Sequence, residues 1–211
     1  MAKDRPWCLV LSGGGAKGVY HIGAWRALRE LGVEVDAFIG NSIGALVAPF
    51  MALGLSEELE EIAKGIGIDF ILKVPPELVR DGELSVGIDR LPELRELARD
   101  FVKRGGLDTA PLRALLERSI DEARLRASGK DLGIVTVSLT ELQPRELFLE
   151  AMEDGHLVDY LMASAAVPGF VAPVIKGKKY VDGGVHDNLP YTVALKRGYR
   201  RVIVEIGRAH V

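Results

Sequence analysis

Residues 35–53 read VDAFIGNSIGALVAPFMAL and decide the fold. The apolar residues from Val35 to Ile39 predict a buried β-strand, and the apolar run after Gly44 predicts a buried helix through about Leu53. Between them, Gly40-Asn41-Ser42-Ile43-Gly44 forms Gly-x-Ser-x-Gly.

In this position the motif is typical of a nucleophile elbow, a strained turn that holds a serine hydroxyl out at the edge of a sheet. Gly40 and Gly44 would remove side chains that clash in such a turn. Ser42 is therefore a candidate nucleophile. The five residues alone also fit a serine- and glycine-rich helix start without any catalytic role.

A similar strand, turn and helix come before this stretch. Trp7 to Ser12 predicts a buried strand, Gly13 to Gly18 a tight turn, and the apolar spacing from Val19 to Leu31 an amphipathic helix. The order strand, helix, strand, helix implies a parallel sheet and an α/β fold.

The turn reads Gly13-Gly14-Gly15-Ala16-Lys17-Gly18 and contains the Gly-x-Gly-x-x-Gly spacing of dinucleotide-binding loops. That fingerprint needs an acidic residue at the end of the second strand to bind ribose, whereas Asp36 lies at the strand's start. A phosphate-binding loop is excluded because Val19 stands where lysine is required. The N–H groups of Gly13, Gly14 and Gly15 instead suit an oxyanion hole, and Lys17 is either a ligand for an anionic head group or a solvated helix-start lysine.

The rest of the chain alternates similarly. We expect Ser56 to begin a helix as its cap. Residues 69–106 are less regular, and a charged helix from Leu91 to Lys103 makes them a candidate lid, substrate cap or long connection. After these we predict helices at 110–119, 121–127, 157–166 and 191–196, a strand pair at 132–140 and 146–150, and strands at 179–181 and 201–206.

A serine nucleophile needs a base, and each histidine has a more ordinary interpretation. His21 suits packing beside the glycine loop, His156 precedes a helix, and His186 lies in a turn. Asp182 ends a short strand, and Gly183 and Gly184 after it allow another backbone to approach. A carboxylate there can accept the serine proton directly, although Asp-Gly-Gly is more often an ordinary turn.

Composition limits the class of protein. The chain has 211 residues, 48% hydrophobic, and its 30 acidic and 27 basic residues give a net charge of -3. These values predict one soluble domain and disfavour binding to nucleic acid. One cysteine and four scattered histidines make structural zinc improbable. No stretch reads as a signal peptide or membrane span, so we expect a cytoplasmic protein, with peripheral membrane contact left open.

Four blocks in order resemble the patatin-like phospholipase family. They are the glycine loop at 13–18, the serine elbow at 40–44, Ala-Ser-x-x-x-Pro at 163–168 with Phe170, and Asp182-Gly183-Gly184, which Asn188-Leu189-Pro190 extends. The resemblance spans 7 to about 204 and is loosest at 69–106. It implies a three-layer α/β/α sandwich with a mainly parallel sheet.

The resemblance also implies a chemistry, a Ser-Asp dyad with Ser42 as nucleophile and Asp182 as proton acceptor. Attack on an acyl ester would form an acyl-enzyme, with the oxyanion held by the N–H groups of Gly13 to Gly15 and no metal or cofactor. We therefore expect a lipid acyl hydrolase acting on phospholipids, lysophospholipids or neutral lipids. A non-catalytic module that binds acyl chains or anions on the same fold is the alternative. The sequence leaves the choice of water or alcohol as acceptor and the oligomeric state open.

The carboxyl end supports a separate hypothesis. The chain stops on a predicted strand without a covering helix, and Glu205-Ile-Gly-Arg-Ala-His-Val211 back-translates to a common sequencing adapter. We expect the natural protein to continue beyond about Val204 and residues 205–211 to be non-native, so that 1–211 holds a single but truncated domain.

Overall fold

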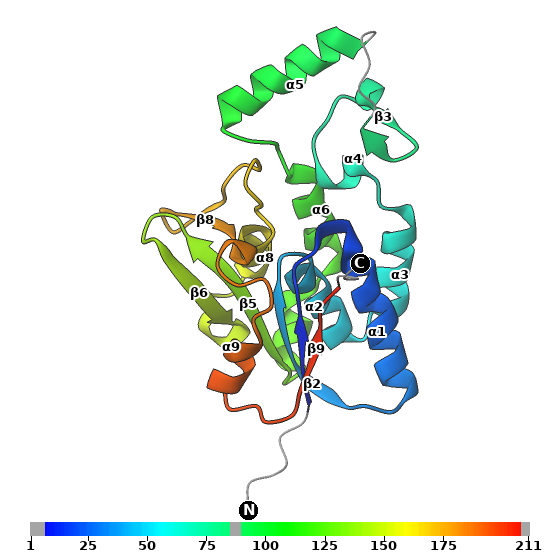
Figure 1. Ribbon diagram of the computed structural model, residues 1–211, viewed down its shortest axis with the longest axis vertical. Helices are drawn as coiled ribbons and strands as arrows, with labels where there is room; N and C mark the ends of the chain where they lie inside the picture. The colour runs from blue at the N-terminus through cyan, green and yellow to red at the C-terminus, as the bar shows by residue number, and fades with distance from the viewer. Residues whose placement is uncertain (1–6, 85–89, 208–211) are drawn as a thin grey trace, which may run out of the picture.

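The protein is represented by a computed structural model that describes residues 7–84 and 90–207. Residues 1–6 and 208–211 lie outside the described residues, and with them the last four residues of the stretch 205–211 that we expect to be non-native. Within these ranges a seven-stranded sheet forms the centre of the molecule (Figure 1).

The sheet has the order β7-β8-β5-β2-β1-β9, and β6 pairs with β5 as a branch. Its strands are β1 (Trp7–Leu11), β2 (Val35–Asn41), β5 (Asp131–Ser138), β6 (Gln143–Phe148), β7 (Val174–Ile175), β8 (Lys178–Asp182) and β9 (Val202–Glu205). The central strands β5, β2, β1 and β9 run parallel, which confirms the expected parallel sheet. Strands β6, β7 and β8 add antiparallel pairs on one side, including the predicted pair β5 and β6.

The main helices follow the predicted segments closely. They are α1 (Val19–Glu30), α2 (Ile43–Leu53), α3 (Ser56–Gly65), α5 (Leu91–Arg104), α6 (Ala110–Ser119), α7 (Glu122–Ala127), α8 (Leu157–Ser164) and α9 (Tyr191–Lys196). Shorter elements are α4 (Ile68–Ile71), the 3-10 turns η1 (Gly15–Gly18), η2 (Pro76–Leu78), η4 (Leu149–Ala151) and η5 (Gly183–Val185), and a hairpin of β3 (Val79–Arg80) and β4 (Glu83–Leu84).

Alternation along the strands creates two cores. Leu9 and Phe38 lie in the large apolar cluster with residues of α1, α2, α3, α6, α7 and α8. The next positions along the strands, Val10 and Ile39, lie in a small cluster with α9. The sheet is therefore covered on both faces, thickly on one and by a single short helix on the other, and the predicted three layers are confirmed.

Strand β5 brings the ends of two distant strands together. It pairs with β6 on one edge, while on the other edge its first part pairs in parallel with β2 and its last three residues pair antiparallel with β8. In this register Asn41 lies opposite Val135, and Asp182 lies opposite Thr136, the next residue. The carboxyl ends of β2 and β8 therefore meet.

Two further findings concern the helices. The expectation that Ser56 caps α3 was wrong: Leu55 is at the cap position, and the Ser56 hydroxyl instead accepts hydrogen bonds from Trp25 Nε1 and Arg29, each at 3.0 Å. None of the helices within 7–84 and 90–207 is long and apolar enough to cross a membrane.

Candidate active site

Ser42 occupies a strained turn between β2 and α2. Its backbone has φ 53° and ψ −126°, a region that residues other than glycine rarely adopt and that costs about 1–3 kcal/mol. A Cβ on Gly40 would lie 2.4 Å from the backbone nitrogen of Ala45, and one on Gly44 would lie 2.4 Å from the Leu11 carbonyl oxygen. Both glycines are therefore required by close backbone approach, as an elbow demands.

A second serine holds this turn in place. The Ser42 N–H donates to the Ser164 hydroxyl at 2.9 Å, and that hydroxyl donates to the Val135 carbonyl at 2.7 Å. Ser164 is fully buried at the carboxyl end of α8. It lies in the Ala-Ser-x-x-x-Pro block, whose sequence gave no indication of this contact.

Asp182 ends β8 and is only 4% exposed. Its Oδ1 accepts the Gly184 N–H at 2.7 Å. Its Oδ2 is buried and receives no well-aligned hydrogen bond from a described residue, although the Ser42 hydroxyl and the Asn41 side chain lie near enough to stabilise its charge. Burial raises the pKa of the carboxyl, and the nearby Ser42 hydroxyl, the Gly184 N–H and the Asn41 side chain oppose that rise. The register of β5 thus brings a buried carboxylate beside the serine turn.

The glycine loop after β1 offers two free N–H groups rather than three. The Gly13 N–H donates to the Asn188 carbonyl at 3.0 Å, so it is not available to a ligand in this conformation. Gly14 and Gly15 are exposed, and no described residue accepts a hydrogen bond from their N–H groups. The expectation that Gly13 offers a free N–H therefore needs correction, and Gly14 and Gly15 remain as the candidate oxyanion donors.

Two asparagines connect the loop, the elbow and the aspartate turn. Asn188 Nδ2 donates to the Gly13 carbonyl at 3.2 Å, and Asn188 Oδ1 accepts from Asn41 Nδ2 at 3.4 Å. A Cβ on Gly13 would lie 2.3 Å from Asn188 Oδ1, so the contact requires glycine there. Sequence reasoning assigned no role to Asn41 or Asn188, although both lie within the quoted motifs.

The remaining motif residues lie around this cluster. A Cβ on Gly18 would lie 2.2 Å from Cγ1 of Ile43, so the glycine loop packs directly on the elbow. A Cβ on Gly183 would lie 2.4 Å from Asn41 Oδ1. Lys17 is exposed and forms no ion pair within the described part of the chain.

The histidines take other positions. His21 is fully buried in α1, and its Nε2 donates to the Ser12 carbonyl at 2.9 Å, so it packs beside the glycine loop as expected. His156 Nδ1 contacts Asp159 at 2.8 Å, and His186 is exposed. Of the histidines that the structure describes, none hydrogen-bonds to Ser42.

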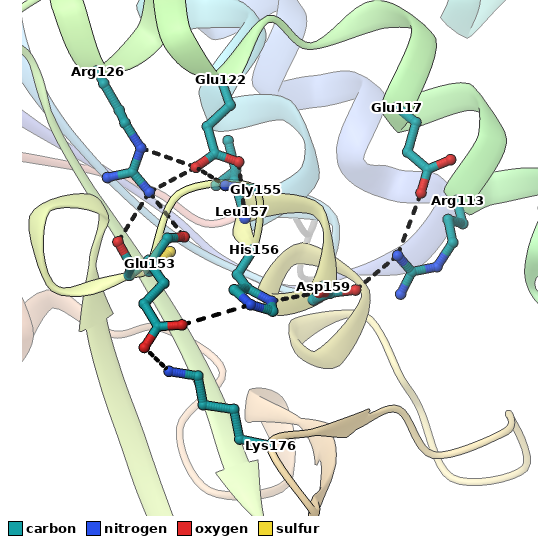
Figure 2. A network of polar contacts seen from close by, with 11 residues as sticks. Arg113, Glu117, Glu122, Arg126, Glu153, Gly155, His156, Leu157, Asp159 and Lys176 are labelled. Atoms are coloured by element: carbon teal, nitrogen blue, oxygen red, sulfur yellow. Dashed lines mark hydrogen bonds and ion pairs between the residues drawn. The ribbon is translucent and has the colours of Figure 1, made fainter.

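A network of charged side chains anchors the start of α8, the helix that carries Ser164 (Figure 2). The carboxylate of Glu122 in α7 accepts the N–H groups of Gly155 at 3.0 Å and Leu157 at 3.1 Å. Arg126 pairs with Glu122 at 2.6 Å and donates to the carbonyls that precede α8. The carboxylate thereby satisfies the Leu157 N–H, one of those that a helix start leaves without partners, and the N–H of Gly155 just before the cap residue.

Comparisons with known proteins identify the family of the chain. The family model described as patatin-like phospholipase matches residues 9–195. An uncharacterized NTE family protein of Mycobacterium tuberculosis is 28% identical over 183 residues, which are 86% of this chain and 43% of that protein. Lysophospholipase NTE1 of Mycosarcoma maydis is 29% identical over 94% of this chain and 10% of its own length. The probable lipid hydrolase 463L of Invertebrate iridescent virus 6 is 26% identical over 89% and 63%.

Among solved structures, VipD from Legionella pneumophila has the same fold, with a TM-score of 0.59 at 20% identity, over 90% of this chain and 47% of that one. The chain spans less than two thirds of the length of each of these proteins. The family match covers the glycine loop from Gly13, the elbow and the aspartate turn. The chain therefore belongs to the patatin-like phospholipase family.

Proposed function

We propose that this protein is a serine lipid acyl hydrolase in which Ser42 is the nucleophile and Asp182 accepts its proton. The observation that carries the proposal is the buried Asp182 Oδ2, which receives no well-aligned hydrogen bond from a described residue and lies beside the Ser42 turn. A buried carboxylate oxygen without such a bond is costly, and such groups concentrate at functional sites.

The proposed reaction has two steps. The Ser42 hydroxyl oxygen attacks the ester carbonyl while its proton passes to Asp182 Oδ2, and the N–H groups of Gly14 and Gly15 stabilise the oxyanion. Collapse of the intermediate breaks the ester bond, and the departing alkoxide takes the proton from Asp182. Water then attacks the carbonyl of the acyl-enzyme and gives a proton to Asp182. Collapse of this second intermediate releases the fatty acid, and the departing Ser42 oxygen takes the proton back from Asp182.

Fatty-acyl esters are the substrate class because the relatives bear the names lysophospholipase and lipid hydrolase. Phospholipids, lysophospholipids and neutral acyl esters all present the ester that this mechanism requires.

The test uses p-nitrophenyl butyrate and a fluorophosphonate probe. Ser42→Ala and Asp182→Asn should each lower kcat by at least about 10³-fold, since each removes one member of a coupled pair. The circular-dichroism spectrum should stay unchanged. His186→Ala, a change at an exposed histidine in the same turn, is the matched control and should keep full activity. Full activity of either dyad variant would refute the mechanism.

Labelling tests the alternative of a non-catalytic acyl-binding module. The parent protein should be labelled at Ser42 by the fluorophosphonate, and Ser42→Ala should not. A folded parent protein that stays unlabelled and hydrolyses no acyl ester would favour the binding module.

A further inference from the structure

Helix α5 projects from the body of the protein. It lies at one extreme of the molecule's long axis, toward which the carboxyl ends of β1 and β2 point (Figure 1). None of its residues is buried. Gly105 and Gly106 follow it, and Leu107 then returns to the body through backbone hydrogen bonds with Gly169 at 2.8 Å and Val171 at 3.0 Å.

The apolar residues of α5 form one stripe. With 3.6 residues per turn, one side of the helix carries Leu91, Leu94, Leu97, Ala98, Phe101 and Val102. Leu94 and Leu97 are half-buried toward the body, while Val102 is 80% exposed and Phe101 is 41% exposed. The outer half of the stripe therefore faces solvent.

A row of basic side chains begins beside the exposed edge of this stripe, at Arg95, and turns away from it toward Lys103. Arg95, Arg99 and Lys103 are spaced four residues apart, so they share one side of the helix, and all three are exposed. No described residue forms an ion pair with any of them. Like charges at this spacing destabilise an isolated helix, and an anionic surface outside the chain would offset that repulsion.

The acidic residues of α5 lie on the rest of the helix surface. Helical spacing places Glu96 beside Lys103, and Asp100 and Glu93, both half-buried, between Lys103 and the half-buried edge of the stripe at Leu97. The exposed edge of the stripe therefore has Arg95 and Arg99 beside it and no acid, which is the pattern of a helix that lies in the interface of an anionic membrane.

We propose that α5 docks this protein on an anionic lipid surface, with Phe101 and Val102 inserted among the acyl chains and Arg95 and Arg99 on the phosphate groups. This inference rests on the proposed function, because docking at this end would bring the lipid to the side of the sheet where Ser42 and Gly14 lie.

Vesicle flotation of the Ser42→Ala protein separates binding from turnover. It should float with phosphatidylcholine vesicles that contain 30% phosphatidylglycerol, and much less with pure phosphatidylcholine. The double variant Arg95→Gln, Arg99→Gln should bind the anionic vesicles roughly 30-fold more weakly, because each basic residue near the surface contributes about 1 kcal/mol of binding free energy. Phe101→Ser with Val102→Ser should weaken binding by at least about tenfold, through lost apolar burial.

The matched control is Leu31→Ser. Leu31 follows the carboxyl end of α1 and is 78% exposed, so its replacement should leave flotation unchanged. When Ser42 is retained, the two α5 variants and Leu31→Ser should all hydrolyse p-nitrophenyl butyrate at the rate of the unmodified protein. Equal flotation of the α5 variants and the parent would overturn the inference. It would also be overturned if light scattering showed that the variants change the oligomeric state while flotation stays the same.

The two proposals can fail separately. A protein that hydrolyses the soluble ester but does not float with anionic vesicles would refute docking and leave the hydrolase intact. A protein that floats through α5 but is inactive and unlabelled would refute the hydrolase alone.

Discussion

The backbone N–H of Ser42 donates to the hydroxyl of Ser164 at 2.9 Å. The nucleophile candidate is thereby held from the end of a helix that lies far along the chain. Because this N–H is already paired, it is not free to stabilise an oxyanion. In the proposed mechanism the oxyanion is therefore stabilised by the glycine loop, where Gly14 and Gly15 are exposed.

Ser164→Ala should therefore impair catalysis as well as stability. It leaves the Ser42 N–H and the Val135 carbonyl unpaired in the core, which costs about 1–3 kcal/mol of unfolding free energy. We expect kcat to fall roughly tenfold to 100-fold as the elbow loses its fixed geometry, with little change in KM. Urea unfolding and steady-state kinetics measure the two effects.

Ser138→Ala is the matched control for this change. Ser138 is also fully buried in β5, and its hydroxyl accepts the Glu141 N–H at 3.2 Å, away from the elbow. It should lose stability but keep its kcat. Ser164→Thr, which retains a hydroxyl, should recover part of the activity, and an equal loss of kcat in both alanine variants would contradict the positioning role.

The raised pKa of Asp182 predicts how activity depends on pH. The proposed base must be ionised, so kcat should decline as pH falls, with a midpoint above the value of about 4 that is ordinary for a free aspartate. A pH profile on the soluble ester measures this limb. A midpoint at or below about 4 would contradict the effect of burial.

The same raised pKa predicts that ionisation of Asp182, which the proposed activity requires, lowers the stability of the folded protein. A folded-state pKa above the unfolded value means that the folded protein binds more protons between the two, so Asp182 lowers stability as pH rises through that window. Asp182→Asn should therefore be at least as stable as the parent at pH 7. This advantage should vanish below about pH 4, where the Asp182 carboxyl is protonated in both the folded and the unfolded state. Thermal unfolding at both pH values tests the sign.

Asn188→Ala should disturb the glycine loop. The change removes the hydrogen bond to the Gly13 carbonyl and the acceptor for Asn41 Nδ2. We expect kcat to drop by about tenfold or more, because the adjacent Gly14 and Gly15 donors lose their alignment. Val185→Ala, at a 60% exposed position in the same turn, should leave kcat unchanged, and equal kinetics of both variants would contradict the proposal.

The network at the start of α8 should contribute to stability more than an exposed ion pair does. Glu122→Ala leaves the N–H groups of Gly155 and Leu157 without their acceptor and removes the partner of Arg126. It should lower the unfolding free energy by about 1–3 kcal/mol. Glu117→Ala breaks the 3.4 Å pair with Arg113 at a 54% exposed carboxylate and should cost less than about 0.5 kcal/mol (Figure 2). Equal urea midpoints would contradict the capping role.

Local signals in the sequence predicted most of the elements. The alternation of apolar residues in β1 and β2, the glycines after them and the helical spacing of α1 each depend on neighbours within one or two turns of chain. Local signals likewise indicated Ser42, which follows a strand between two glycines, and Asp182, which ends a strand and is followed by two glycines. The prediction that Ser56 caps α3 was wrong because its hydroxyl accepts a hydrogen bond from Trp25, a residue of another helix.

The sequence by itself determined an α/β fold, a serine in an elbow and a glycine loop beside it, since these follow from periodicity and from backbone space that only glycine leaves. The tertiary structure alone decided how they combine. The shared edge of β5 brings Asp182 to the elbow, Ser164 takes the Ser42 N–H, and Asn188 takes the N–H of Gly13. Such pairings depend on strand register and on hydrogen bonds between residues far apart in the chain, which no local pattern encodes.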